Sequence, residues 1–160
     1  MWLSIDEAGV KTLRIYGEEA VWLGSDIKDF VGLLTTLEPR TYWRISPVPG
    51  DRDDYFDATG ASSEKLEMLA KSGEFITGEA LAELAQETRQ VIWGQFVGHT
   101  DLNSAAVWVT VRAIDSSFFE VITSDENVLS LMKSHFTDVR PYVAPWGGGM
   151  DPGEPILDEV

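Results

Sequence analysis

Residues 77–98, TGEALAELAQETRQVIWGQFVG, begin the stretch that decides the fold, which continues to Phe136. The apolar side chains in it recur at the spacing of a helical turn, and glutamates and glutamines occupy the opposite side. Thr77 can cap the first turn, and Gly98 suits the left-handed conformation that ends many helices. These features predict one long amphipathic helix over about residues 78–97, with most of the core built on it.

A strand hairpin is predicted directly after this helix. Residues 105–114 and 118–123 alternate apolar and polar side chains, and residues 115–117 between them suit a tight turn. A turn of this length pairs Arg112 with Glu120 across the hairpin. One face of the hairpin is then apolar and carries Val107, Val109, Val111, Ala113, Phe119 and Val121.

The other predicted elements are shorter. Strands are expected at residues 2–5, 12–16, 20–23, 41–46 and 139–144. Pro141 indicates an edge position for the last of them. Helices are expected after a cap at Ser25, over residues 63–71 with Gly73 as the terminator, and after a capping box formed by Thr123 and Glu126. Residues 46–62, rich in proline, glycine and aspartate, are expected to form a long loop.

These elements predict an α+β fold. A mainly antiparallel sheet of about five to seven strands would pack against the long helix and roughly two or three shorter helices. Residues 12–46 and 107–144 share the order strand, turn, strand, Ser-Asp, helix, strand, which suggests a ββαβ pseudo-repeat. The shared order has two explanations, a duplication or the capping chemistry common to strand-to-helix junctions. We expect a single domain over residues 1–144 and a Gly/Pro-rich acidic tail over 145–160.

The charge balance limits the choice of partners. The 160-residue chain contains 27 acidic and 12 basic residues, so its net charge is −15. Nucleic acid and anionic membranes are therefore unsuitable partners, because both are bound mainly through lysine and arginine. The charge serves either solubility alone or the steering of a basic partner towards the protein. The chain has no cysteine, no signal peptide and no long apolar run, which predicts a cytoplasmic protein.

No metal, cofactor or catalytic site is predicted. The two histidines, His99 and His135, do not occur in a metal-binding spacing. Asp101 and the serines of residues 115–117 supply the other residue types of a His–Asp–Ser triad. No nucleophile motif accompanies them, so a catalytic triad is not predicted. The aspartate-rich loop resembles a calcium loop superficially. It lacks the required glycine at its sixth position and the required acid at its twelfth.

The candidate partner-binding residues combine carboxylates with aromatic side chains. The carboxylates are expected on one ridge of the long helix, at Glu79, Glu83 and Glu87, and in the loop, at Asp51, Asp53, Asp54 and Asp57. The remaining candidates are Trp93, at the edge of the buried helix stripe, and Trp108 with Arg112, on the second side of the hairpin. Trp93 would either pack under a neighbouring element or anchor a partner.

We therefore predict a non-enzymatic acidic module that binds a basic protein. The combination of acidic surface and aromatic anchors is typical of immunity proteins and inhibitors that neutralise nuclease-type toxins, a similarity of composition. One alternative is a small enzyme or ligand-binding domain with its pocket near His99. Another is an assembly subunit in which the face with Trp108 and Arg112 is buried in a homo-oligomer.

Overall fold

The computed structural model describes residues 9–17, 27–50, 55–104, 106–115 and 117–143. The described strands are β1 (Lys11–Tyr16), β2 (Tyr42–Ser46), β3 (Asp57–Gly60), β4 (Phe75–Thr77), β5 (Thr88–His99), β6 (Val109–Ile114), β7 (Phe118–Thr123) and β8 (Asp138–Tyr142). The described helices are α2 (Ile27–Leu37), α3 (Ser63–Ser72), α4 (Gly78–Gln86) and α5 (Glu126–His135). None of these helices is long and apolar enough to cross a membrane.

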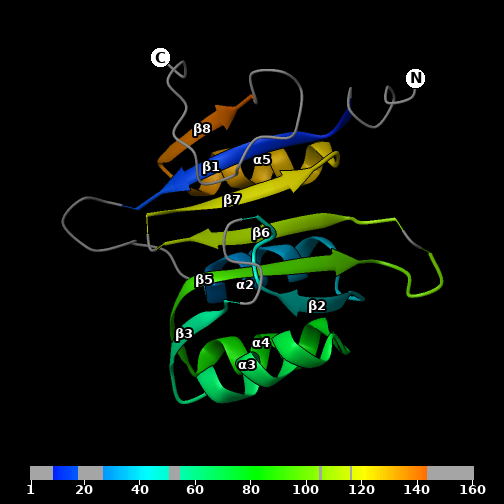
Figure 1. Cartoon of the computed structure of the whole chain (residues 1–160). Helices are drawn as coiled ribbons and strands as arrows, with labels where there is room; N and C mark the ends of the chain where they lie inside the picture. Colours follow the sequence, from blue (N-terminus) through cyan, green and yellow to red (C-terminus); the bar gives the residue numbers. More distant parts are fainter. Residues whose placement is uncertain (1–8, 18–26, 51–54, 105, 116, 144–160) are drawn as a thin grey trace.

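The strands form one sheet of eight strands with antiparallel pairing throughout, which confirms the predicted α+β class. The sheet has more strands than the five to seven expected, because the segments of β3, β4 and β5 were not predicted as strands. The main path through the sheet is β4-β2-β5-β6-β7-β1-β8, and β3 pairs with the first half of β5 (Figure 1). Sequence neighbours are often not sheet neighbours. The first described strand, β1, lies between β7 and β8, which are the last two described strands in the sequence.

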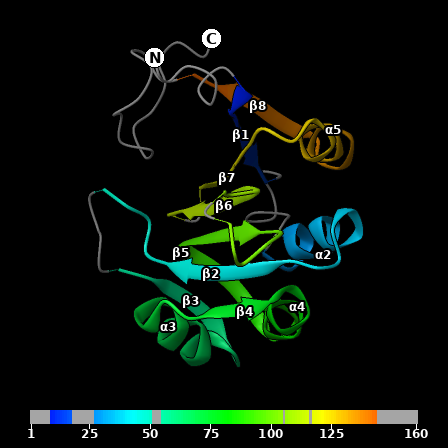
Figure 2. The same cartoon turned by 90° about the vertical axis from the view of Figure 1, so that its right-hand side faces the viewer.

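Helices α5, α2 and α4 follow one another in a row on one side of this sheet, whereas α3 lies at its lower end beside β3 (Figure 2). All four described helices bury apolar residues in a single core with one face of the sheet. We call this side the helix face and the opposite side the second face. The largest buried side chains on the helix side include Phe30 of α2, whose ring lies 4.6 Å from Phe119 and 4.9 Å from Phe136.

The prediction of one long helix over 78–97 is wrong beyond Gln86, which lies nearly halfway along the predicted helix. Helix α4 ends at Gln86, and residues 88–99 form β5, the longest strand. This segment is rich in β-branched and aromatic residues, which favour strands. Strand β5 pairs with β2, β3 and β6, and is largely buried, so apolar residues are needed on both of its faces. Apolar residues on both faces of a strand also satisfy a helical spacing, which explains the error.

Gly98 lies near the end of β5, opposite Trp43 of β2. A Cβ atom at Gly98 would lie 2.8 Å from Cη2 of Trp43, the residue opposite it on β2. The indole ring of Trp43 therefore lies across β5 at the position that a side chain would occupy. Gly98 provides space for this ring rather than a helix terminus.

The hairpin prediction is confirmed in its register. Strands β6 and β7 pair Arg112 with Glu120 and Val111 with Val121. The predicted apolar face is buried in the core at Val109, Val111, Ala113, Phe119 and Val121. Val107 is the exception, since β6 begins only at Val109 and the side chain of Val107 is 50% exposed.

Several local predictions are also confirmed. Oγ1 of Thr77 accepts a hydrogen bond from the backbone N–H of Ala80 at 3.1 Å, as expected for the cap of α4. Helix α3 ends at Gly73, which has the left-handed φ of 72°. The strands expected at 12–16 and 41–46 correspond to β1 and β2, and the last strand is at the sheet edge, as its proline indicated.

Two further predictions need correction. The expected loop 46–62 contains a strand, β3, which pairs with β5. The cap of α5 is Asp125 rather than Thr123: Oδ1 of Asp125 accepts from the N–H of Asn127 at 2.8 Å. The hydroxyl of Thr123 donates instead to the carbonyl of Trp108 at 2.7 Å, so it joins β7 to β6.

Some predicted elements lie outside the described residues. These are the strands at 2–5 and 20–23, the cap at Ser25, and the tail at 145–160. The ββαβ pseudo-repeat is not confirmed, because its first unit requires the strand at 20–23.

Replacing Asp125 with alanine should reduce the free energy of unfolding by about 2 kcal/mol. The change removes the helix cap, and it also leaves the indole N–H of Trp108 without the carboxylate oxygen that it donates to at 2.8 Å. Chemical denaturation would measure the loss. Ser130→Ala, an exposed change on the same helix, should stay within about 0.5 kcal/mol of the original protein. Equal stabilities of the two variants would contradict this role of Asp125.

Candidate functional site

The predicted glutamate ridge is exposed, although its helix is shorter than expected. Glu79 and Glu83 lie on α4, and Glu87 is the residue that follows its last turn. More exposed glutamates are contributed by α3 and by the residue before β4. We call the resulting surface the acidic end, and it comprises Glu64, Glu67, Glu74, Glu79, Glu83 and Glu87.

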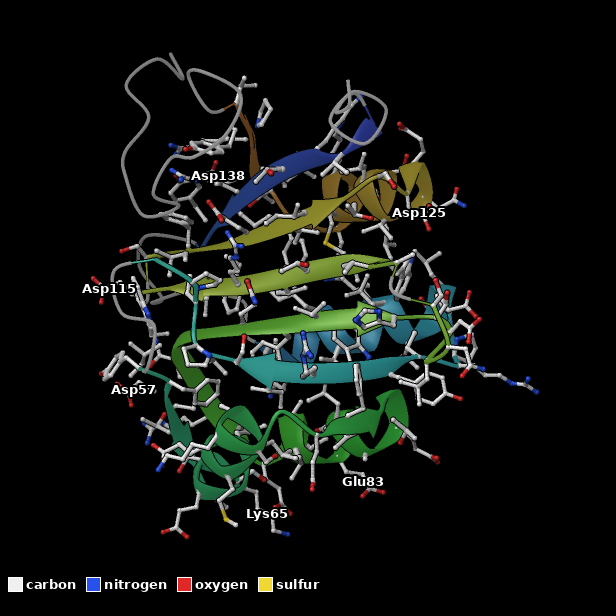
Figure 3. The ribbon with its side chains drawn as sticks, turned by 45° about the vertical axis from the view of Figure 1, so that its right-hand side comes forward. Asp57, Lys65, Glu83, Asp115, Asp125 and Asp138 are labelled. Atoms are coloured by element: carbon white, nitrogen blue, oxygen red, sulfur yellow. The ribbon has the colours of Figure 1, made fainter. Side chains whose placement is uncertain are left out.

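The acidic end lies at the end of the molecule opposite to β8 (Figures 1 and 2). Glu83 of α4 and Lys65 of α3 both point outward there (Figure 3). Within the described chain, no salt bridge involves any of these six glutamates. Two lysines, Lys65 and Lys71, are the basic residues on α3 and α4, so the surface is strongly negative.

Exposed apolar side chains accompany the carboxylates. Met68 of α3 is 68% exposed, which is a large exposed fraction for an apolar side chain. Phe75 of β4 is 41% exposed. Phe75 stacks under the guanidinium of Arg44, whose carbon lies 5.5 Å from the ring centroid. Methionine and aromatic residues are enriched in the centres of protein interfaces, where they fill partner pockets.

The aspartate-rich loop does not join this surface as a unit. Asp51, Asp53 and Asp54 lie outside the described residues. Asp57 is on β3 and accepts a hydrogen bond from the hydroxyl of Tyr55 at 2.8 Å. In Figure 3, Asp57 lies at the same side of the molecule as Asp115, away from Glu83.

The structure places Trp93 on a strand and packs it inside the protein. Trp93 lies on β5 opposite Asp57 of β3, and it is half-buried against a small apolar cluster formed by Val48, Ile114 and Phe118. This arrangement corresponds to the first of the two predicted roles, packing under a neighbouring element. It gives no support to Trp93 as an exposed anchor.

Trp108 and Arg112 do not form an exposed pair. The indole N–H of Trp108 donates to Asp125 at the start of α5, and the ring packs against the main core. Arg112 lies on the second face, where Nε donates to Oε1 of Gln95 at 2.7 Å and Nη1 lies 3.6 Å from Glu120. Each side chain is engaged within the protein.

A row of polar side chains that includes Arg112 crosses the second face, and we call it the polar row. Arg14 of β1, Glu120 of β7, Arg112 of β6, Gln95 of β5 and Ser46 of β2 occupy directly opposed positions on adjacent strands. Nε of Arg14 donates to Oε2 of Glu120 at 2.9 Å, and Nε2 of Gln95 donates to the hydroxyl of Ser46 at 3.1 Å. The row is a continuous chain of polar contacts across five strands, in which the link between Arg112 and Glu120 is a longer ion pair and the other links are hydrogen bonds.

Two arginines in this row share one buried carboxylate. Arg14 is 4% exposed and Glu120 is 1% exposed, so both charges are removed from water. The Arg14 guanidinium also lies 4.4 Å from the centroid of the Phe118 ring and 3.9 Å from that of Tyr142. Burial raises the pKa of Glu120, and the nearby charges of Arg14 and Arg112 oppose this shift. Burial likewise lowers the pKa of Arg112, with Glu120 acting in the opposite direction.

The sequence allowed only part of this row to be found. The pairing of Arg112 with Glu120 followed from the hairpin, because the turn fixes the register over a few residues. Arg14 and Gln95 join them through pairings of β1 with β7 and of β5 with β6. Arg14 and Glu120 are 106 positions apart, and no local pattern signals such a contact.

His99, the residue suggested for an enzyme pocket, is 7% exposed at the end of β5. Its Nδ1 lies 2.9 Å from the carbonyl of Ala106, an arrangement in which this nitrogen donates. Its Nε2 has no hydrogen-bond partner among the residues that the structure describes, and its ring contacts Phe75 edge-on. Asp101 instead accepts from the N–H of Asn103 in its own loop. In the described chain, therefore, no hydrogen bond joins His99 to an acidic or nucleophilic side chain with which it could act in catalysis.

A metal centre is also without support in the described residues. No group of three or more histidine, aspartate or glutamate side chains there could hold an ion.

The chain matches no known protein-family model, no curated protein and no solved structure.

Proposed function

We propose that this protein is an acidic protein-binding module, of the inhibitor or immunity type, which binds a basic protein surface through its acidic end. The observation that supports this proposal is the exposure of six glutamates around α3, β4 and α4, none of them in a salt bridge with another described residue. Glu87 accepts a hydrogen bond from the hydroxyl of Ser62 at 3.3 Å, but carboxylates without a basic partner in the described protein are available for lysines and arginines of another protein.

The charges and the apolar side chains have different roles in such a complex. A surface with charge of one sign attracts an oppositely charged partner and increases the association rate by about 10-fold to 1000-fold at low salt. Met68 and Phe75 would then provide the apolar contacts that hold the complex together, since rim charges alone contribute little to the final affinity. A basic protein with an apolar pocket is the partner that this surface fits best.

The proposal can be tested with two variants of identical net charge. The first, Glu67→Gln/Glu79→Gln/Glu83→Gln, neutralises three carboxylates of the acidic end. The second, Asp101→Asn/Asp115→Asn/Glu126→Gln, neutralises three exposed carboxylates elsewhere and serves as the matched control. Each immobilised protein is exposed to a lysate of its source cells at about 50 mM salt, where electrostatic attraction is weakly screened.

The unchanged protein and the control variant should capture the same basic protein. The amount of this protein that the first variant retains should be lower by about tenfold or more. Raising the salt concentration to about 500 mM should slow the association of the captured partner with the unchanged protein. The proposal fails if no basic protein is retained at low salt. It also fails if both triple variants lose the partner equally, because bulk charge would then explain the binding.

A further inference from the structure

His99 has a buried side-chain nitrogen without a hydrogen-bond partner in the part of the chain that the structure describes. The residue is 7% exposed, and its Nδ1 lies 2.9 Å from the carbonyl oxygen of Ala106. Because a carbonyl oxygen can only accept, Nδ1 is the donor, and in the neutral ring Nε2 is then an acceptor. Nε2 is shielded from solvent and receives no hydrogen bond from a described residue. A buried acceptor in this state is costly, and the cost is removed when a donor reaches it.

Exposed apolar side chains accompany this nitrogen. The ring centroid of Phe75 lies 5.5 Å from that of His99, in an edge-on contact. Leu102 and Val107, in the loop that joins β5 to β6, are 49% and 50% exposed. The hydrogen bond from His99 to Ala106 holds this loop against the end of β5. Phe75, Leu102 and Val107 therefore provide apolar surface close to the unsatisfied acceptor.

Phe75 is the neighbour that can give a ligand access to Nε2. It lies on β4, a strand of three residues at the edge of the sheet, and it is 41% exposed. A partly exposed side chain on a short edge strand can change its rotamer without disturbing the core. Rotation of the Phe75 ring away from His99 would open Nε2 to a hydrogen-bond donor.

The charged side chain in contact with Phe75 favours a neutral donor. The guanidinium carbon of Arg44 lies 5.5 Å from the centroid of the Phe75 ring. A lysine or arginine that approached Nε2 would come close to this positive charge and be repelled by it. The indole N–H of tryptophan and the hydroxyl of tyrosine are neutral donors on apolar rings, and such rings pack favourably against phenylalanine. They match both the acceptor and the apolar side chains near it.

From these observations we infer that Phe75 and His99 form a binding site for an aromatic side chain that carries a neutral N–H or O–H donor, a tryptophan or tyrosine of a partner protein. The donor bonds to Nε2 of His99, and the aromatic ring packs against the rotated ring of Phe75. The inference rests on the proposed function in one respect, that the aromatic side chain belongs to the basic protein bound at the acidic end. Strand β4, which carries Phe75, lies between Glu74 and Glu79 of that surface.

The test uses the full chain labelled with ¹⁵N, in which NMR observes the ring nitrogens of the two histidines. The variant His135→Gln, changed at an exposed position of α5, assigns the signals of His99. Indole is the probe, and N-methylindole, which keeps the apolar rings but lacks the N–H, is its matched control. Indole should produce a saturable shift of the Nε2 resonance of His99. N-methylindole should bind about tenfold more weakly and leave this resonance unchanged.

Substitutions separate this site from general apolar binding, with the backbone amide of Phe75 as the reporter. His99→Asn keeps a side-chain N–H that can donate to Ala106 but has no atom in place of Nε2. It should bind indole about tenfold more weakly than the unchanged protein does, and no more tightly than it binds N-methylindole. Val10→Ala shortens an exposed apolar side chain next to β1 and should leave indole binding unchanged.

The inference is overturned if the Nε2 resonance of His99 does not respond to indole, or if it responds equally to N-methylindole. The resonance of the unchanged protein decides the question even if the His99 variant does not fold. A failure here is distinguishable from a failure of the proposed function, because capture of a basic protein at low salt is measured separately and depends on the glutamates of the acidic end.

Discussion

Replacing Arg14 with methionine is expected to lower the free energy of unfolding by about 3–5 kcal/mol at pH 7, because it removes the nearest counter-charge of a buried carboxylate. Methionine has a similar length and keeps an apolar contact with the rings of Phe118 and Tyr142. The loss is therefore mainly electrostatic: Glu120, 1% exposed, would retain only the longer contact with Arg112. Denaturant unfolding followed by circular dichroism would measure it.

The same substitution should make stability depend more strongly on pH. Burial already raises the pKa of Glu120, and removing Arg14 removes the largest opposing influence, so the pKa rises further. A carboxyl group with a raised folded-state pKa contributes stability below its unfolded value of about 4.3. This contribution is lost as the pH rises through the folded-state pKa. The stability difference between Arg14→Met and the unchanged protein should accordingly shrink as the pH is lowered from 7 towards about 4.5.

Two further variants test the electrostatic explanation. Arg140→Met removes an exposed arginine from the neighbouring strand and should cost about 1 kcal/mol or less, as is usual for surface ion pairs. Arg14→Met/Glu120→Leu removes both buried charges and should be more stable than Arg14→Met alone by about 1 kcal/mol or more. A double variant less stable than Arg14→Met would show that packing, rather than the isolated charge, dominates at this position.

Replacing Trp43 with alanine is the second change with a large expected effect, a loss of about 3–5 kcal/mol in the free energy of unfolding. Trp43 is 1% exposed, and its ring covers Gly98 on β5 while its indole N–H donates to the hydroxyl of Thr41 at 3.0 Å. The alanine variant would leave a cavity between β2, β5 and the helix layer, which the surrounding side chains fill only in part. Thermal and denaturant unfolding would both report the loss.

Phe75→Ala provides the matched control for this prediction. It removes an aromatic ring from the adjacent strand β4, but that ring is 41% exposed, so the loss should be about 1 kcal/mol or less. Gly98→Ala should also destabilise the protein, because its methyl group would overlap the Trp43 ring. In the background of Trp43→Ala the same methyl group should cost less, since the space is then empty. Additive effects of the two changes would refute the proposed contact.

The elements that could be predicted are those that depend on neighbours in the chain. The register of β6 and β7 is set by a short turn together with an alternating pattern, and it was obtained correctly down to the pair Arg112–Glu120. The caps at Thr77 and Gly73 likewise use groups within a few residues of the helix end. The cap of α5 was misplaced by two residues, because Thr123, Ser124 and Asp125 all have suitable side chains.

The sequence by itself determined the alternation of buried and exposed residues, the α+β class and the positions of most helices and strands, because these properties arise from local periodicity. Only the tertiary structure decided that residues 88–99 form a strand and that Arg14 meets Glu120. The reason is physical: a segment with apolar residues on both faces of a strand also places them at helical spacing, so it is compatible with a helix or with a doubly buried strand. The choice between them depends on the distant strands that pair with it. In this protein the stretch chosen as one central helix is a short helix followed by the strand that joins β2, β3 and β6.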